Sequence, residues 1–387
     1  MEILAGIHQL SPAEGAESYL VTVCRELERL GHEVTVFTAE PGGPPDGVRV
    51  ATAERGLPLA PDVIYAQDAY AALLLADLYP LTPQAFVLQE GTDDLWLPPQ
   101  LPGVIAVVIA CDDRVAARAR AASLAQKLVR LRQPVDVEEH SPRGPLADPP
   151  RRVHLSSGGL SDHRRGVLER ACAAAGLETV DATADADIVV GRGRAAVEAM
   201  AAGRAVYVYG DDGGDGWVSP DRYELLEADG FTGRAEPTAT DFDWLRYDLD
   251  AYSPDLGPAA RELAVANHDA ADHAHELVAI FEGLAPRRDP VEAPLRELAR
   301  LVRVQAAVDR RAEMFSAEAH ASRARVQELE GELDEARARG DELASRVEEL
   351  EIALQEARER EAAALAQRSR GVRGLLNREE KIPSTEG

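Results

Sequence analysis

The stretch from Asp187 to Tyr209, DIVVGRGRAAVEAMAAGRAVYVY, decides the fold. Its two apolar ends, residues 188–190 and 205–209, are rich in β-branched and aromatic residues and too short for helices, so we expect two strands. A glycine loop and a helix ending at Gly203 lie between them. In an open parallel sheet, ligands bind beyond the carboxyl ends of the strands, where loop amides and a helix N-terminus face phosphates. The stretch therefore predicts a nucleotide site.

Three residues fall at the predicted site: Gly191, Gly193 and Glu198. Glu198 lies roughly one turn into the helix, where its carboxylate is suited to bind the paired hydroxyls of a ribose. The alternative is an acid that only complements the positive end of the helix dipole, since acids favour first turns.

Length and charge limit the possible functions. A chain of 387 residues is too long for one ordinary core, so we expect two globular domains and an appendage. Residues 1–290 carry 25 Lys and Arg against 47 Asp and Glu, which makes the body acidic. Broad binding to nucleic acid or to an anionic membrane needs a basic surface and is therefore not expected.

The three cysteines are far apart and fit the pattern of buried free thiols in a reducing compartment. The chain starts directly with a strand pattern, and no run of 18 apolar residues occurs. We expect a cytoplasmic protein with at most peripheral membrane contact through the short basic segment around Leu375.

The first part of the chain alternates between strand and helix patterns, which predicts a parallel, doubly wound sheet. The expected strands are 2–7, 33–38, 63–66, 85–89, 104–110 and 127–132, and the expected helices are 16–30, 69–79 and 113–124. Prolines then interrupt residues 140–150.

A second, smaller α/β series follows, with strands at 153–156 and 178–180, a helix at 162–175, and then the stretch from Asp187. One long helical pattern runs from Pro258 to Leu284. The predicted domains are residues 1–142 and 143–285, each Rossmann-like, with a linker at 286–297.

From Leu298 the apolar residues follow a heptad pattern, which predicts a coiled coil over residues 298–367 and a disordered tail over 368–387. Gln305, Gly340 and Glu361 interrupt the seam, which is therefore weak locally, but it is sustained over more than four heptads and favours a homo-oligomer. A solvated single helix of similar composition is the alternative.

Several segments occur in an order that resembles a known family, the retaining glycosyltransferases of family four, which have the two-domain GT-B fold. They are EGAES at 14–18, GHEVTV at 31–36, PDVIYAQD at 61–68, RQPVD at 132–136 followed by HSP at 140–142, EAMAAG at 198–203, a Gly-Gly pair at 213–214 and DGFTG at 229–233. Together they span residues 1 to about 285. The resemblance implies transfer of a sugar from a nucleotide-sugar donor, held in the second domain, to an acceptor bound mainly by the first.

The resemblance also implies roles for individual residues. Glu198 would hold the donor ribose, Gly213 and Gly214 would line the donor pocket, and Gly15 would let the first domain approach the donor phosphate. Cations near the same loops would neutralise the diphosphate leaving group. The candidates for this role are Arg192, Arg194 and Arg164, with Gly193 between the first two.

The sequence departs from the family pattern at three positions. Val190 stands where the family has the first glutamate of a pair, and Gln67 replaces a common histidine. Glu90 stands where many members have a histidine before Gly-Thr-Asp, so it is the candidate catalytic residue, either as a base or as a carboxylate that stabilises an oxocarbenium-like centre. A loop acid without a chemical role is the alternative, and both the retaining and the inverting outcome stay open.

Two main hypotheses follow. The first is a glycosyltransferase that uses a nucleotide-sugar donor and a saccharide or glycolipid acceptor, as in the synthesis of a surface polysaccharide or glycolipid. The second is an inactive GT-B scaffold assembled through its coiled coil; an epimerase or hydrolase on this fold is a weaker third. No cofactor or metal is expected, because the spacing of Asp211, Asp212 and Asp215 does not fit a calcium loop.

Overall fold

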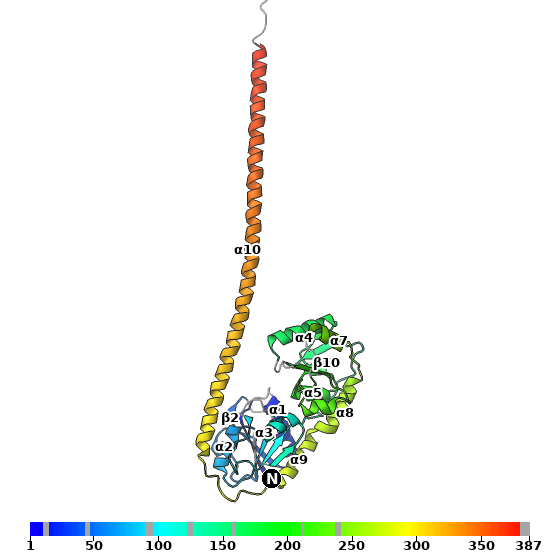
Figure 1. Cartoon of the computed structure of the whole chain (residues 1–387), viewed down its shortest axis with the longest axis vertical. Helices are drawn as coiled ribbons and strands as arrows, with labels where there is room; N and C mark the ends of the chain where they lie inside the picture. The colour runs from blue at the N-terminus through cyan, green and yellow to red at the C-terminus, as the bar shows by residue number, and fades with distance from the viewer. Residues whose placement is uncertain are drawn as a thin grey trace, which may run out of the picture. The chain divides into compact units, whose positions relative to one another are not determined.

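The computed structural model describes residues 1–10, 15–42, 47–89, 96–121, 127–156, 160–210, 213–236 and 241–379. The chain divides into two compact units, Met1–Ala306 and Ala307–Gly387 (Figure 1). The first unit contains two sheets with their helices, and the described part of the second, up to Glu379, is the continuation of one long helix.

Seven parallel strands form the first sheet in the order β3-β2-β1-β4-β5-β6-β7. They are β1 (Glu2–Leu10), β2 (Glu33–Pro41), β3 (Val50–Ala51), β4 (Val63–Ala66), β5 (Gln84–Leu88), β6 (Val107–Ala110) and β7 (Lys127–Arg130). The central strands are buried over their whole length, which explains their nearly continuous apolar sequences.

Helices cover both faces of the first sheet. The helices of this part of the chain are α1 (Gly15–Arg29), α2 (Ala69–Leu78), α3 (Asp113–Ala121) and α9 (Ala270–Glu282). One core contains side chains of α1 and α9, and the other contains side chains of α2 and α3. Helix α9 therefore belongs to the first core, although it follows the second sheet in sequence and lies in the range expected for the second domain.

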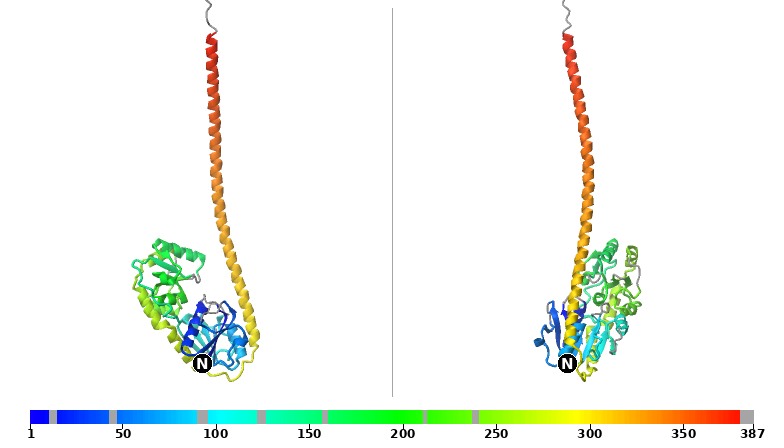
Figure 2. Two further views of the ribbon diagram at one scale, coloured as in Figure 1. Left: turned by 180° about the vertical axis from the view of Figure 1, so that it is seen from behind. Right: turned by 60° about the vertical axis from the view of Figure 1, so that its left-hand side comes forward.

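The second sheet has five strands in the order β12-β11-β10-β8-β9. Its elements are β8 (Arg152–Leu155), α4 (Asp162–Ala174), β9 (Glu178–Thr179), β10 (Ile188–Gly191), α5 (Arg194–Ala201), β11 (Ala205–Gly210), β12 (Gly213–Trp217), α6 (Tyr223–Ala228), α7 (Phe242–Leu249) and α8 (Leu256–His268). One core receives α4 and α7, and the other receives α5, α6 and α8. The layers can be followed in Figure 2.

Two further differences from the expectation concern the second sheet and the helices that follow it. Strand β12 is an additional, antiparallel edge strand paired with β11. The single helix expected over 258–284 is two helices, α8 and α9, which meet at Asp269. The cause is a β-bridge: Val135 N–H donates to the His268 carbonyl at 2.7 Å, and Ala270 N–H donates to the Val135 carbonyl at 3.1 Å. Both pairings are incompatible with a continuous helix.

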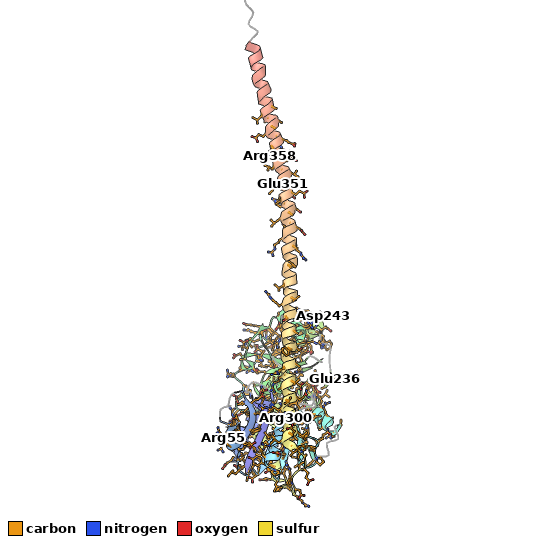
Figure 3. The ribbon with its side chains drawn as sticks, turned by 90° about the vertical axis from the view of Figure 1, so that its left-hand side faces the viewer. Arg55, Glu236, Asp243, Arg300, Glu351 and Arg358 are labelled. Atoms are coloured by element: carbon orange, nitrogen blue, oxygen red, sulfur yellow. The ribbon has the colours of Figure 1, made fainter. Side chains whose placement is uncertain are left out.

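Helix α10 (Leu295–Glu379) begins inside the range expected as a linker. Its first turns pack on the first domain, since Leu295 and Ala299 are buried in the core that contains α2 and α3. Further along α10, the side chains of residues 337–366 are all exposed, including charged ones such as Glu351 and Arg358 (Figure 3).

The fold class expected from the sequence is confirmed. Two Rossmann-like α/β domains, the second with the smaller sheet, precede a long C-terminal helix. This is the architecture of the GT-B fold followed by a helical extension. Whether that helix pairs into a coiled coil stays a prediction.

Candidate functional site

The carboxyl ends of β8 and β10 form the topological switch point of the second sheet. These strands are neighbours, but α4 and α5, which follow them, pack on opposite faces. A Cβ atom added at Gly191 would lie 3.3 Å from Cβ of Ser156, so the two strand ends are in contact. Ligands of doubly wound sheets bind at such a point.

Gly193 forms the amino-terminal cap of α5. It has φ 54° and ψ −131°, a conformation that is practically restricted to glycine. Its N–H donates to the Phe231 carbonyl at 2.9 Å, and its own carbonyl accepts from Ala196 N–H at 3.1 Å. The glycine is thus needed for the sharp turn from β10 into α5.

The DGFTG segment packs beside this turn. The Asp229 carboxylate organises it by accepting from the N–H groups of Thr232 at 3.1 Å and Arg234 at 3.2 Å. A Cβ added at Gly233 would lie 2.9 Å from the Gly213 carbonyl oxygen, which leaves room only for glycine. Segments that lie far apart in the motif order therefore meet at one edge of the second sheet.

Gly213 and Gly214, which the resemblance assigns to the donor pocket, lie in a strand. Both are buried at the start of β12, where Gly213 pairs with Gly210 and Gly214 pairs with Tyr209. The strand begins beside the carboxyl end of β11, so the glycines still lie at the edge of the sheet where the switch point is found.

The candidate cations lie in different environments. Arg192 is half-buried beside the end of β11, because a Cβ added at Gly210 would be 3.5 Å from its Cδ. Arg164 is half-buried in the first turn of α4. In the first domain, Gly15 is the first residue of α1, the helix that follows β1. Of the predicted set, Arg192, Gly193, Gly213 and Gly214 come together around the end of β11.

Glu198 and Arg194 form an ion pair on α5. Arg194 Nε lies 2.8 Å from Glu198 Oε1, and the Glu198 side chain is 28% exposed. Burial lowers the pKa of Arg194, and the Glu198 carboxylate beside it counteracts this effect. The pair leaves the second carboxylate oxygen of Glu198 available for other donors.

Arg194 was expected to face a diphosphate, but its guanidinium is directed to the domain junction. It donates to Ser18 Oγ at 3.1 Å and Thr22 Oγ1 at 3.0 Å, both on α1, and to the Pro134 carbonyl at 2.9 Å. With only 8% exposure and four oxygen partners, Arg194 connects the two domains and positions Glu198. Sequence reasoning missed these partners because no local pattern marks them.

The three positions at which the sequence departs from the family pattern are Glu90, Val190 and Gln67. Glu90 lies outside the described residues. Val190 is 1% exposed and packs in the core between the second sheet and helices α4 and α7. An acid at this position of β10 would be buried in an apolar core, so the valine fits the local packing. Gln67 is also buried and accepts a hydrogen bond from Gln89 Nε2 at 3.2 Å.

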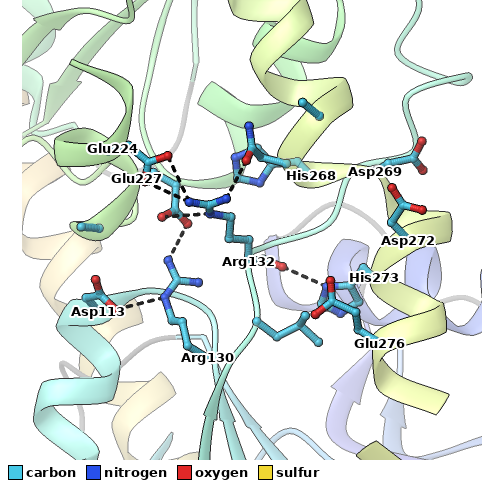
Figure 4. A pocket seen from close by; sticks show the side chains of 14 residues that line it. Asp113, Arg130, Arg132, Glu224, Glu227, His268, Asp269, Asp272, His273 and Glu276 are labelled. Atoms are coloured by element: carbon cyan, nitrogen blue, oxygen red, sulfur yellow. Dashed lines mark hydrogen bonds and ion pairs between the residues drawn. The ribbon is translucent and has the colours of Figure 1, made fainter. Parts of the chain in front are cut away.

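A separate pocket of about 420 Å³ lies at the domain junction (Figure 4). Its lining contains none of the candidate donor-site residues. Arg130 Nη2 approaches Glu227 Oε1 at 2.5 Å, and Arg132 Nη2 approaches Glu224 Oε2 at 2.9 Å, so two arginines from the end of the first sheet meet two acids of α6. The pocket thus lies beside a charged contact between the domains.

Two buried histidines occupy this junction as neutral side chains. His268 Nδ1 donates to the Gln133 carbonyl at 2.7 Å, and its Nε2 accepts from the Tyr223 hydroxyl at 2.9 Å. His273 Nδ1 donates to the Arg132 carbonyl at 2.9 Å, and its Nε2 accepts from the Tyr19 hydroxyl at 3.0 Å. Burial lowers the pKa of His268 to about 4 and that of His273 to about 3.

Within the described part of the chain, no group of three or more His, Cys, Asp or Glu side chains is arranged to hold a metal ion. Asp211 and Asp212 lie outside that part. Asp215 is buried and accepts from Glu236 N–H at 2.9 Å and Ala235 N–H at 3.3 Å, so its carboxylate fixes a loop. No described helix is both long and apolar enough to cross a membrane.

Comparisons with known proteins found structural similarity only. No family model and no curated protein matches the sequence. Among solved structures, HepE of Anabaena in complex with UDP-glucose is 15% identical, with a TM-score of 0.49 over 73% of this chain and 100% of that one. A glycosyltransferase of Rickettsia africae is 11% identical, with a TM-score of 0.48 over 73% and 98%. Sucrose-phosphate synthase of Thermosynechococcus elongatus is 13% identical, with a TM-score of 0.48 over 73% and 98%.

Proposed function

We propose that the protein is a glycosyltransferase that binds the nucleotide of its sugar donor at the switch point of the second sheet. The observation that carries the proposal is the position of Glu198, one turn into α5 and directly behind the glycine cap at Gly193. This combination offers helix N–H groups to phosphate and a carboxylate to a ribose at the place where doubly wound sheets bind nucleotides.

In this proposal each side chain has a distinct task. The free oxygen of Glu198 accepts from the ribose hydroxyls, while Arg194 holds the other oxygen and sets the carboxylate's direction. Arg192 and Arg164 neutralise the diphosphate. Gly213 and Gly214 keep the adjoining edge of the sheet narrow enough for close approach of the donor.

The first domain supplies the acceptor side. Gly15 at the start of α1 lets the backbone approach the donor phosphate. In the transfer step the acceptor oxygen bonds to the anomeric carbon while the bond from that carbon to the diphosphate breaks. The acceptor's proton goes either to the departing phosphate or to Glu90. The two routes correspond to the retaining and the inverting outcome.

Thermal unfolding with nucleoside diphosphates and nucleotide sugars tests the proposal. Binding to the folded state alone stabilises it by about 2.7 kcal/mol at a ligand concentration 100 times Kd. We expect at least one nucleotide to raise the Tm of the wild type, and Glu198→Ala to weaken that nucleotide's binding at least about tenfold, the effect of one lost charged hydrogen bond.

The matched control is Glu262→Ala, which removes an exposed acid on α8 of the same domain. It should leave the nucleotide-dependent shift unchanged. If no nucleotide raises the Tm of the wild type, the donor-site proposal fails. If Glu198→Ala and Glu262→Ala bind equally well, the site holds a nucleotide but Glu198 does not contact it.

An inactive nucleotide-binding scaffold is the second candidate. It is favoured by Val190, since the position that carries an acid in the resembled family is here part of an apolar core. The two candidates differ in turnover. Release of a nucleoside diphosphate that depends on an added saccharide or glycolipid acceptor supports the transferase, whereas tight donor binding without release across an acceptor panel supports the scaffold.

A further inference from the structure

Helix α10 carries a line of exposed apolar side chains along much of its length. Its positions recur every seven residues in two sets, three residues apart, which we name a and d. Gln305, Gly340 and Glu361 interrupt position a, and alanines fill several places in both sets. The large apolar residues at position a are Val326, Leu333, Val347 and Leu354, and those at position d are Leu301, Val308, Phe315, Leu329, Leu343 and Leu350. All ten are between 46% and 68% exposed. So much aligned apolar surface on a helix calls for a partner.

The charged residues beside this seam restrict the choice of partner. Positions e and g flank the seam, and in a parallel, in-register pair each g residue faces the e residue five positions later on the other helix. Every such pair that brings two charges together is attractive: Glu318 with Arg323, Arg325 with Glu330, Glu332 with Arg337, and Arg346 with Glu351. No g–e′ pair between residues 304 and 365 joins like charges.

An antiparallel pair would place g opposite g′. Five of the seven charged g residues are arginines, at 311, 325, 339, 346 and 360, and the two acids are at 318 and 332. The other g positions from 304 to 360 hold only these two acids and two neutral residues, Val304 and Ala353, so in a full antiparallel overlap at least one of the five arginines faces another arginine. The flanking charges therefore favour the parallel orientation of identical helices.

The residue types in the seam favour two strands. Valine at a together with leucine at d is the combination found in parallel dimers, whereas higher oligomers prefer other arrangements of branched residues. Two of the four large apolar residues at position a are valines, Val326 and Val347, and four of the six at position d are leucines, at 301, 329, 343 and 350.

We propose that α10, from Leu301 onward, forms a parallel, in-register, two-stranded coiled coil with a second copy of this chain. Leu298 is excluded because it is partly buried against the core of its own first domain. A parallel coil attaches both globular bodies to its amino-terminal end. The pairing does not depend on the proposed donor chemistry.

Disulfide trapping tests orientation and register. Ser322 at d and Gly340 at a interrupt the apolar seam, so Ser322→Cys and Gly340→Cys introduce thiols without removing an apolar contact. In a parallel, in-register dimer each cysteine faces its own copy, and both variants should form covalent dimers under mild oxidation. In an antiparallel pair, only residues at the midpoint of the overlap face their own copies. Two positions that lie 18 residues apart therefore cannot both form disulfides between identical residues.

The controls are the wild type and Ser345→Cys, which lies on the opposite side of the helix at position f. Cys24, Cys111 and Cys172 are buried, so the wild type should give little covalent dimer. Dimers from both seam variants and few from Ser345→Cys support the proposal. Dimers from one seam variant or neither contradict it, as does a monomer mass for the wild type in sedimentation equilibrium.

A charge exchange tests the proposed g–e′ pairing independently. Glu351→Arg sets arginine against Arg346 of the other copy, and we expect the dimer dissociation constant to rise about tenfold, since each pair is counted twice per dimer. Adding Arg346→Glu should restore most of the affinity. Glu348→Arg, at position b away from the seam, is the matched control. A double variant as weak as Glu351→Arg alone would contradict the parallel register.

Discussion

Arg194 connects the function of the second domain to its contact with the first. Its guanidinium reaches Ser18 and Thr22 on α1, the Pro134 carbonyl between the domains, and Glu198 on its own helix. A buried arginine with these partners fixes the Glu198 rotamer and also the separation of α1 from α5. Loss of Arg194 should therefore affect both stability and ligand binding.

The variant Arg194→Met keeps much of the side-chain volume but removes every hydrogen bond. We expect the free energy of unfolding to fall by about 2–3 kcal/mol, somewhat less than for a fully buried pair because Glu198 is partly exposed. The affinity for the nucleotide found by the thermal panel should fall as well, since Glu198 loses its orientation. Urea unfolding and calorimetric titration measure the two effects.

Arg170→Met, on the exposed side of α4, is the control and should change neither quantity appreciably. If Arg194→Met is destabilised but binds nucleotide with unchanged affinity, Arg194 has a structural role only and does not position Glu198.

The sequence predicts some of these residues better than others. Gly193 and Glu198 were placed by a local pattern, strand to glycine loop to helix, and this pattern extends over few residues. The direction of Arg194 depends on Ser18 and Pro134, which are 176 and 60 residues away. A single sequence contains no signal for such contacts, and the position of an arginine next to a glycine loop suggested a phosphate instead.

The break between α8 and α9 lies at the domain junction, where it pairs with Val135. The helical pattern of residues 258–284 is continuous, because Asp269 alone does not interrupt a helix. It is the pairing with Val135 that ends α8 and starts α9 with a new cap, in which the Asp269 carboxylate accepts from Ala271 N–H at 2.9 Å. The residues that follow the break place His273 beside His268 in the interior.

The two histidines make the junction sensitive to acid. In the folded protein the pKa is about 4 for His268 and about 3 for His273, below the usual 6.5. At a pH between the folded pKa and 6.5, each histidine therefore binds more protons in the unfolded chain than in the folded one. Stability is then complete above pH 6.5 and is lost as pH falls, by about 1.4 kcal/mol per pH unit for each histidine. Urea unfolding between pH 7 and pH 4.5 measures this slope.

The double variant His268→Gln/His273→Gln should lose less stability over the same pH range than the wild type. The control is His275→Gln, which replaces an exposed histidine on α9, and it should keep the wild-type slope. Asp68 acts in the opposite direction, because burial raises its pKa to about 6, and its effect is the same in all three proteins. Equal slopes for the wild type and the double variant would show that the histidines do not titrate as described.

At the scale of the whole chain, the end of the body lies inside helix α10. Leu295 is 3% exposed and Ala299 is 1% exposed, both in the core of the first domain, whereas the seam residues beyond them are exposed. The heptad pattern predicted a rod from Leu298 but could not reveal that its first turns belong to the globular part. The heptad pattern predicts which face of the helix is buried, but it does not show whether the first domain or a second helix covers that face.

Two shortened chains test separately whether α10 stabilises the first domain and whether it mediates self-association. A chain that ends at Ala306 should be a monomer by light scattering, with the Tm and nucleotide response of the full protein. A chain that ends at Pro290 should also be monomeric but less stable by about 2–4 kcal/mol, because it lacks the buried Leu295 and Ala299. Equal stability of the two would contradict the packing of α10 on the first domain, and an oligomer of the chain ending at Ala306 would place self-association in the body.

The order of synthesis matters for a body built in this way. The core of the first sheet is completed by Ala274, Leu277 and Phe281 of α9 on one face and by Leu295 and Ala299 of α10 on the other. On the ribosome these side chains emerge only after the whole second sheet. The amino-terminal domain, although made first, must therefore wait for the second domain before it can close its core, and the second domain can finish folding before the first.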